Sequence, residues 1–152
     1  MATAKQQLGE LGEVLVAKHC ICPRCKRNKT LKRLPANFKC ADLVCDFCGY
    51  LAQVKASKVK DVTVMPKTIL GAAWGPQKLR MDAGIYFPLF VVLISKVTIK
   101  EFGIYYLSAD LQTPGMFIPR KPLSPSAKRA GWQGFYYDMQ SVDDALVLLK
   151  VN

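Results

Sequence analysis

The sequence predicts one α/β domain, from its length, its helical pattern near the start and its later apolar runs. A chain of 152 residues fits a single hydrophobic core with at most a small appendage. A hydrophobic fraction of 51% is too high for a disordered chain. We therefore expect a single domain over residues 1–152, in which a helix, several strands and a final helix follow one another.

Five elements have clear patterns. Leu8–Cys20 predicts a helix, because its leucines recur at helical spacing and its acidic residues lie off that stripe. Phe38–Val44 and Tyr50–Ala56 are typical of strands, and the residues CDFCG between them predict a hairpin. Tyr86–Ser95, rich in β-branched and aromatic residues, predicts a buried strand, and Gly103–Leu107 a shorter one.

The remaining segments are less regular. Residues 21–39 are basic and show no periodicity, which predicts a loop. Gly71–Met81 is consistent with a short helix or an irregular segment, and residues 113–134 contain four prolines and should be irregular. Ser141 predicts the start of a final helix, SVDDALVLLK, whose two aspartates lie in the first turn, where the helix dipole favours them.

Composition narrows the function. The formal charge of +11 points to a polyanionic partner, and we expect double-stranded DNA. The single histidine, His19, excludes nucleases and metal sites that need several imidazoles. The longest apolar run has ten residues, about half of a membrane span, so no membrane partner is expected. The N-terminus has no apolar signal core, which predicts a cytoplasmic protein.

The positive charge is concentrated in two segments. Lys18–Lys39 contains eight basic residues and no acidic ones. The segment RKPLSPSAKRAGW carries the second run and ends on an aromatic side chain. The predicted DNA-contacting residues of this segment are Arg120, Lys121, Lys128, Arg129 and Trp132. Acid-free runs of this kind also occur as solvated faces, and Trp132 is equally consistent with a core anchor.

Four of the six cysteines form two Cys-x-x-Cys pairs separated by 19 residues. Two such knuckles complete a four-sulfur zinc site, which has no open position and is therefore structural. We predict Zn²⁺ bound in an insertion around residues 20–49 by Cys22, Cys25, Cys45 and Cys48. Disulfides and a thioredoxin-like redox pair are the competing interpretations. Cys20 and Cys40 are expected to be buried free thiols.

Polar residues next to the second knuckle form the catalytic candidate. Gln53 and Lys55 share one face of a strand, and hairpin pairing brings Asp42 beside them. Oxygens of Asp42 and Gln53 suit catalytic Mg²⁺, and a lysine orients or deprotonates the attacking water. Glu13, on the first helix, offers a second carboxylate. The simpler interpretation is a solvated polar face, because Gln-x-Lys is a common triplet.

This set of residues resembles the PD-(D/E)xK nuclease superfamily. More specifically, CPRC, CADLVCDFCGYLAQVKASK and IPRKPLSPSAKRAGWQG resemble the catalytic domain of DpnI-type restriction endonucleases, over about residues 8–138. The resemblance implies a central mixed sheet flanked by helices with an embedded four-cysteine zinc site. It also implies a magnesium-dependent endonuclease directed to adenine-methylated DNA, with Asp42, Gln53 and Lys55 at the family's acid, acid-x-Lys positions.

Two departures from that family leave alternatives open. Gln53 stands where the family has glutamate, so a non-catalytic zinc module that binds DNA is a second interpretation. The chain stops at Asn152 with room for one terminal helix, so we expect a catalytic domain without the family's winged-helix reader. The helix pattern GELGEVLVA is also similar to resolvase-like nucleases of the same superfamily. Recognition by a homodimer or by a partner subunit is a further expectation.

Overall fold

The computed structural model describes residues 2–38 and 41–152. Cys40, expected as a spare thiol, and Lys39 of the first basic run lie outside these residues. By their internal contacts the residues form two compact units. Unit 1 comprises Met1–Val64, Phe87–Ala109 and Leu146–Asn152, and unit 2 comprises Met65–Tyr86 and Asp110–Ala145. The expected single domain stays a prediction.

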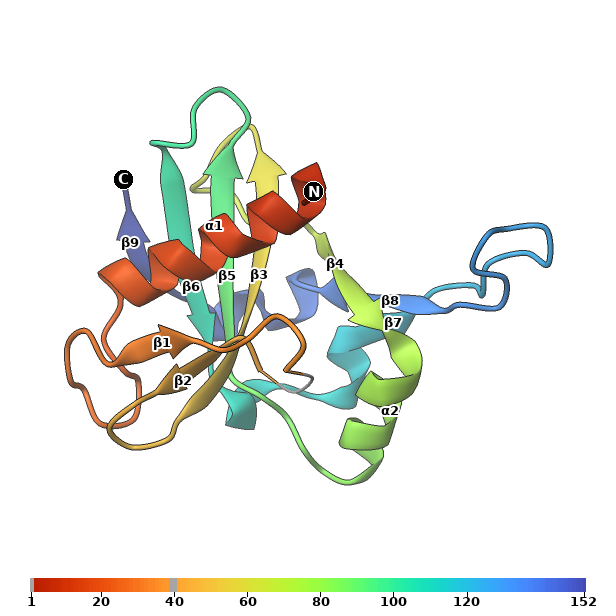
Figure 1. Ribbon diagram of the computed structural model, residues 1–152, viewed down its shortest axis with the longest axis horizontal. Coiled ribbons are helices and arrows are strands. Elements are labelled where there is room, and N and C mark those ends of the chain that lie inside the picture. The colour runs from red at the N-terminus through yellow and green to blue at the C-terminus, as the bar shows by residue number, and fades with distance from the viewer. Residues whose placement is uncertain (1, 39–40) are drawn as a thin grey trace. The chain divides into compact units, whose positions relative to one another are not determined.

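Unit 1 is built on a six-stranded mixed sheet (Figure 1). In spatial order its strands are β1 (Leu31–Arg33), β2 (Leu43–Cys45), β3 (Leu51–Val59), β5 (Leu89–Ser95), β6 (Phe102–Leu107) and β9 (Val147–Val151). The central pair, β3 and β5, is parallel and the other neighbours are antiparallel. The predicted mixed sheet and the hairpin that joins β2 to β3 are therefore confirmed.

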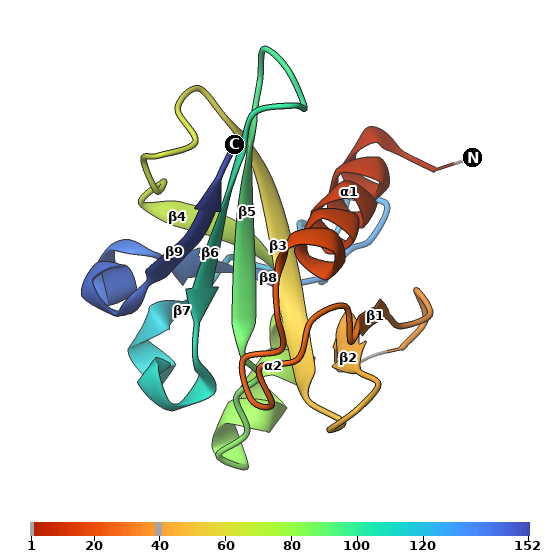
Figure 2. The ribbon, with the colours of Figure 1, turned by 90° about the vertical axis from the view of Figure 1, so that its left-hand side faces the viewer.

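Helix α1 (Ala4–His19) covers one face of this sheet (Figure 2). It begins four residues before the predicted start, at a capping box in which Thr3 and Gln6 satisfy each other's backbone N–H groups. Its glycine at position 12 lies directly over Val54 and Ala56 of β3. Ala52, Val54 and Ala56 of β3 consequently face the helix and the core.

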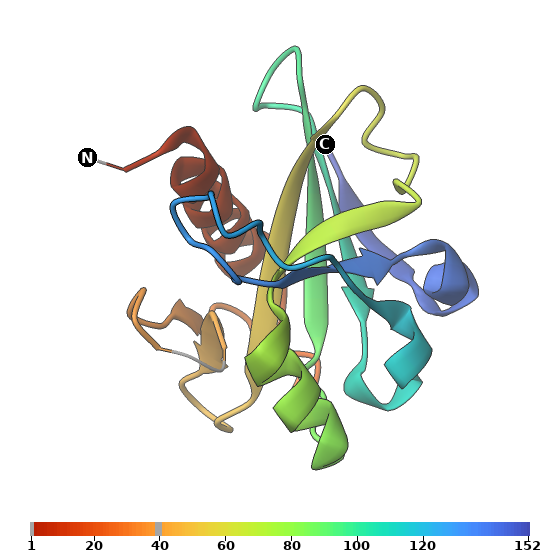
Figure 3. The same cartoon turned by 90° about the vertical axis from the view of Figure 1, so that its right-hand side faces the viewer.

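Unit 2 contains a three-stranded antiparallel sheet in the order β4-β8-β7. Its strands are β4 (Thr68–Ala73), β8 (Gly134–Asp138) and β7 (Phe117–Pro119). Helix α2 (Trp74–Asp82) continues directly from β4 (Figure 3). Short 3₁₀ turns lie at η1 (Ala109–Leu111), which spans the boundary of the units, η2 (Pro114–Met116) and η3 (Gln140–Ala145). A small core forms where the rings of Phe117, Phe135 and Tyr137 meet.

The predicted final helix is wrong. Ser141 lies in η3, and the residues VLLKV that follow it form β9, which pairs with β6 at the end of the sheet. Capping and first-turn charges are local signals, and backbone pairing with β6 outweighs them here. Sequence patterns also miss β1, β4, β7 and β8. Strands of three residues, such as β1 and β7, have no measurable period, and Gly71 interrupts the strand pattern of β4.

Among the described residues, no helix is both long enough and apolar enough to span a membrane.

Candidate metal centre and acidic cavity

The two Cys-x-x-Cys pairs form matching turns in unit 1. In the first, the backbone N–H of Lys26 donates to the carbonyl of Cys22 at 2.9 Å, and Lys26 adopts a left-handed φ of 64°. In the second, Gly49 N–H donates to the carbonyl of Cys45 at 2.9 Å, with φ 78°. Each turn brings its two sulfurs to the same side, which is the geometry of a zinc knuckle.

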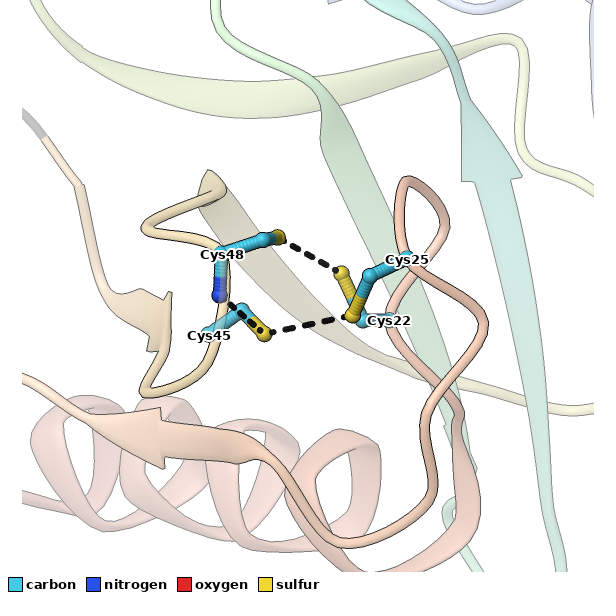
Figure 4. A group of neighbouring side chains, drawn as sticks. All are labelled: Cys22, Cys25, Cys45 and Cys48. Carbon is cyan, nitrogen blue, oxygen red and sulfur yellow. Dashed lines mark hydrogen bonds between the residues drawn. The ribbon is translucent and has the colours of Figure 1, made fainter.

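The four sulfurs converge on one point (Figure 4). Cys22 and Cys48 lie 3.6 Å apart, Cys25 and Cys45 lie 3.7 Å apart, and all four sulfurs lie within 4.8 Å of one another. These separations exceed the roughly 2.05 Å of a disulfide, so the disulfide interpretation is wrong for this arrangement. A tetrahedral zinc with Zn–S bonds of about 2.3 Å places its sulfurs about 3.8 Å apart. The predicted four-cysteine cluster is confirmed, and its donors fit zinc.

The thiols of the cluster differ in acidity. Burial acts to raise the pKa of Cys45, but the hydrogen bond with Thr30 and those from the Cys48 and Phe47 backbone outweigh it and lower the pKa to about 6. Burial raises the pKa of the spare thiol Cys20 to about 11, so this group stays protonated, as expected of a buried free cysteine.

A cavity of about 420 Å³ opens on the side of α1 that carries its acidic residues. Helix α1 contributes Glu13, β1 contributes Arg33, and the residue just before β2 contributes Asp42. The complete lining among the described residues is Ala2, Gln6, Gly9, Glu10, Glu13, Arg33, Leu34, Pro35, Ala36 and Asp42. Two of the four predicted catalytic residues, Glu13 and Asp42, therefore share one cavity.

Asp42 is fixed to the edge of β3. Its backbone N–H donates to the carbonyl of Ala52 at 2.9 Å, and its carboxylate Oδ2 accepts a hydrogen bond from the N–H of Val54 at 2.7 Å. The carboxylate oxygen thus accepts a hydrogen bond that a backbone carbonyl of a neighbouring strand would otherwise accept. Its carboxylate consequently lies near the plane of the sheet rather than on either face.

Gln53 and Lys55 precede and follow Val54, the residue of β3 whose N–H binds that carboxylate. Val54 and Ala56 face α1, so strand alternation directs Gln53 and Lys55 to the opposite face of the sheet. Both side chains are half-buried, and neither lines the cavity formed by the described residues. Glu13 therefore lies on the α1 side of the sheet, and the side chains of Gln53 and Lys55 are directed to the opposite side.

Electrostatics in the cavity favour a cation. Burial raises the pKa of Glu13 above its ordinary value, the hydrogen bond from Arg33 opposes this, and the Asp42 carboxylate raises it further. Arg33 Nε donates to Glu13 Oε1 at 3.2 Å. The three carboxylates of Glu10, Glu13 and Asp42 and the one guanidinium of Arg33 leave net negative charge in the lining, and carboxylate oxygens are the ligands that magnesium takes.

Sequence reasoning missed Arg33. It lies in the first basic run, but nothing in that run distinguishes it from the seven other cations. Its place follows from register, because β1 pairs with β2 and the N–H of Leu34 donates to the carbonyl of Asp42 at 2.9 Å. Only that pairing sets Arg33 beside Glu13.

The predicted DNA-contacting residues all lie in the loop between β7 and β8 in unit 2. The loop is a long hairpin closed by backbone bonds between Leu123 and Trp132 and between Arg120 and Gly134. Trp132 is half-buried and packs over Gly134, while the Arg129 guanidinium stacks on its ring at 4.4 Å. Trp132 thus anchors the hairpin and still presents part of its ring to solvent. The remaining members of the predicted set, Lys121 and Lys128, are exposed.

One comparison with known proteins bears on these residues. The model of the DpnI family, described as the Dam-replacing family, matches residues 1–151. The match includes the four cysteines, the acidic cavity and the β7–β8 hairpin. It confirms the resemblance predicted from the sequence motifs.

Proposed function

The chain belongs to the Dam-replacing (DpnI) family, and on that premise we propose that it is a magnesium-dependent endonuclease that hydrolyses phosphodiester bonds of double-stranded DNA. Membership of this family indicates a function related to DNA restriction nucleases. The observation that supports the finer proposal most directly is the position of the Asp42 carboxylate. It is hydrogen-bonded to the N–H of Val54, the residue between Gln53 and Lys55 in β3, and Glu13 lines the same cavity.

Each residue has a role that its chemistry allows. Asp42 and the amide oxygen of Gln53 are the proposed magnesium ligands, and Glu13 offers a further carboxylate. When bound, magnesium supplies a Lewis acid for the phosphate and a more acidic water. The Lys55 ammonium orients the attacking water and offsets the negative charge that develops on the phosphate. Asp42 is held by a backbone N–H, so it needs little reorganisation before reaction.

We propose a mechanical role for zinc. One knuckle follows α1, which carries Glu13. The other forms the turn between β2, which begins just after Asp42, and β3, which carries Lys55. The metal thereby ties the helix to the hairpin and fixes the separation of the catalytic groups. Removing zinc should abolish cleavage at any magnesium concentration. Full cleavage by a folded, zinc-free protein would contradict this role.

The β7–β8 hairpin is proposed to bind DNA phosphates. Its cations position a duplex without reading sequence, and the contact with the Trp132 ring orients the Arg129 guanidinium. Replacing Lys128 and Arg129 by glutamine should weaken binding and flatten its salt dependence, by about one unit of slope for each phosphate that the protein no longer neutralises. An unchanged slope would place the DNA path elsewhere.

The central experiment is cleavage of plasmid DNA in the presence of magnesium. Adenine-methylated, unmethylated and branched DNA are compared for the wild type and for Asp42→Asn and Lys55→Gln. Asp46→Asn and Lys58→Gln are matched controls, because they remove the same charges from exposed positions nearby on the second knuckle and β3. We expect cleavage by the wild type and both controls, and a loss of at least about a hundredfold in the two site variants.

The other outcomes separate the alternatives. Equal cutting by the wild type and the site variants would assign the activity to another site or a contaminant. DNA binding without magnesium binding or cleavage would favour a non-catalytic zinc module, the interpretation that Gln53 and the Arg33–Glu13 pair support. Preference for branched DNA would favour a resolvase-like nuclease, and preference for methylated DNA a methyl-adenine-directed one. Sedimentation of the active species would show whether a homodimer or an added partner subunit is needed.

A further inference from the structure

We infer that the zinc knuckles themselves form a second contact surface for duplex DNA, in addition to the β7–β8 hairpin. This knuckle surface consists of five exposed side chains around the four sulfurs: Arg24, Lys26, Arg27, Lys29 and Phe47. The inference rests on the proposed function for the identity of the partner. Its chemistry is independent of the catalytic groups, because none of the five lines the acidic cavity.

The charge of the knuckle surface is almost unopposed. Four cations fall within eight residues of the first knuckle, and no acidic residue occurs between Glu13 and Asp42. In the second knuckle, Asp46 is exposed and lies 3.9 Å from Lys32, which lies outside the surface. Four clustered cations attract a polyanion such as the DNA backbone, and each phosphate contact releases a counterion.

An exposed aromatic ring lies within this charge. Phe47 is 61% exposed, an unfavourable place for a large apolar side chain unless something covers it. The guanidinium carbon of Arg27 lies over the Phe47 ring at 3.7 Å from its centroid, a close cation–π contact. From its place over the ring, the guanidinium can still donate from its edge to a phosphate. Phe47 thus has a role in positioning Arg27, although it is not part of the core.

The second arginine, Arg24, is also held by residues in or next to the second knuckle. Arg24 lies over the ring of Tyr50 at 5.2 Å, and its Nη1 donates to the carbonyl of Cys48 at 3.3 Å. Each arginine of the first knuckle is thus oriented by a residue in or next to the second. Both knuckles converge on the same four sulfurs, so the cations project from a preordered surface. Binding to such a surface costs less conformational entropy than ordering a free basic loop.

The knuckle surface lies at a useful distance from Asp42. Strand β2 begins one residue after Asp42 and ends on Cys45, so about 10 Å of extended chain, at about 3.3 Å per residue, separates Asp42 from the start of the second knuckle. Each DNA strand carries a phosphate about every 3.4 Å of helix axis. A duplex whose scissile phosphate lies at Asp42 therefore has its next few phosphates within reach of the knuckle cations.

The test is binding of a short fluorescent DNA duplex, followed by anisotropy over a range of salt concentrations. Calcium replaces magnesium so that the duplex stays intact. Arg27→Gln and Lys29→Gln each remove one charge, and Phe47→Leu removes the stacking ring while remaining apolar. Lys100→Gln and Val97→Ala are matched controls in the exposed β5–β6 loop. Zinc content is measured for every variant, so that loss of the knuckles is distinguished from loss of the surface.

We expect Arg27→Gln to weaken binding about tenfold and to lower the salt slope by about one unit. Phe47→Leu should weaken binding several-fold, Phe47→Tyr should restore it, and both controls should match the wild type. Lys29→Gln leaves the stack untouched and should still lower the slope.

Three results would overturn the inference. Zinc-loaded Arg27, Phe47 and Lys29 variants with wild-type affinity and slope would remove the knuckle surface from the DNA path. Variants that bind the duplex as the wild type does but bind single-stranded DNA more weakly would show that the surface binds single strands instead. Absence of any duplex binding by the wild type would refute the proposed function itself, and the inference with it. In contrast, intact duplex binding with no cleavage would leave the inference standing while the proposed catalysis fails.

Discussion

Replacing Gly12 by alanine tests how closely α1 lies on the sheet. A Cβ at this position would lie 2.9 Å from the Cβ of Ala56 and 3.4 Å from Cγ1 of Val54. Both neighbours belong to β3, which is hydrogen-bonded to β5 from Gln53 to Val59. Neither contact atom is the far end of a flexible side chain, so neither can move aside easily. We expect an overpacking cost of about 1–3 kcal/mol. This exceeds the gain of about 0.5–1 kcal/mol that alanine brings over glycine inside a helix.

Gly9, one turn earlier on the same helix, provides the matched control. A Cβ there meets nothing within 4 Å, so Gly9→Ala receives the helical gain alone. The difference between the two variants isolates the packing cost, because the propensity term is common to both. A central value of about 2 kcal/mol corresponds to a Tm that is roughly 4–8 °C lower for Gly12→Ala than for Gly9→Ala.

The assay is thermal and urea unfolding of zinc-loaded protein without magnesium or DNA. Stability measured in this way is independent of whether the chain is a nuclease. If Gly12→Ala unfolds at the same temperature as Gly9→Ala, or above it, α1 does not contact Val54 and Ala56 as closely as described. Glu13 follows directly in the helix, so that result would also remove the basis for placing its carboxylate opposite Asp42.

Three further predictions concern the metals and the histidine. The wild type should bind one zinc ion per chain, and Cys45→Ser should lose it. Cys20→Ser should retain the zinc, since Cys20 lies outside the sulfur cluster. The measurement is metal analysis of reduced protein, and zinc retained by Cys45→Ser would contradict the site. Burial and the charge of Lys150 lower the pKa of His19 in the folded protein, so the unfolded chain binds a proton at a higher pH than the folded one. The free energy of unfolding should therefore decrease as the pH falls through about 6.5. NMR titration of this sole imidazole should give a pKa below that value, Lys150→Gln should raise it, and a value above 6.5 would refute the assignment. Gln53→Glu adds a carboxylate beside Asp42 and should lower the magnesium concentration for half-maximal cleavage about tenfold, or about 1.4 kcal/mol; an unchanged requirement would exclude Gln53 as a ligand.

Features written in local spacing were predictable. The two Cys-x-x-Cys pairs specify their own turns, and the residues CDFCG between two extended segments specify the hairpin, so the sulfur cluster and the β2–β3 pair follow from the sequence. The long apolar run gives β5, whose seven residues are all buried. These elements need little information from the rest of the chain.

Features set by pairing were not predictable. The residues VLLKV continue a helical pattern and still form β9, because β6 offers an edge that only the folded sheet provides. Arg33 reaches Glu13 through the register of β1 on β2. The same holds for the carboxylate of Asp42, whose bond to the N–H of Val54 depends on where β2 leaves the edge of β3. Side-chain patterns do not encode such edges.

The interleaved order of unit 1 has a consequence for synthesis on the ribosome. The unit draws on three separate segments, and its edge strand β9 belongs to the last of them. The parallel pair of β3 and β5 closes only after the whole of β4 and α2 has been made. Two of the sheet's five strand pairings, β3–β5 and β6–β9, are therefore non-local, which slows folding and leaves apolar strands uncovered while the chain emerges. The sulfur cluster, complete by residue 48, is the exception: zinc can bind there while the rest of the sheet is still being translated.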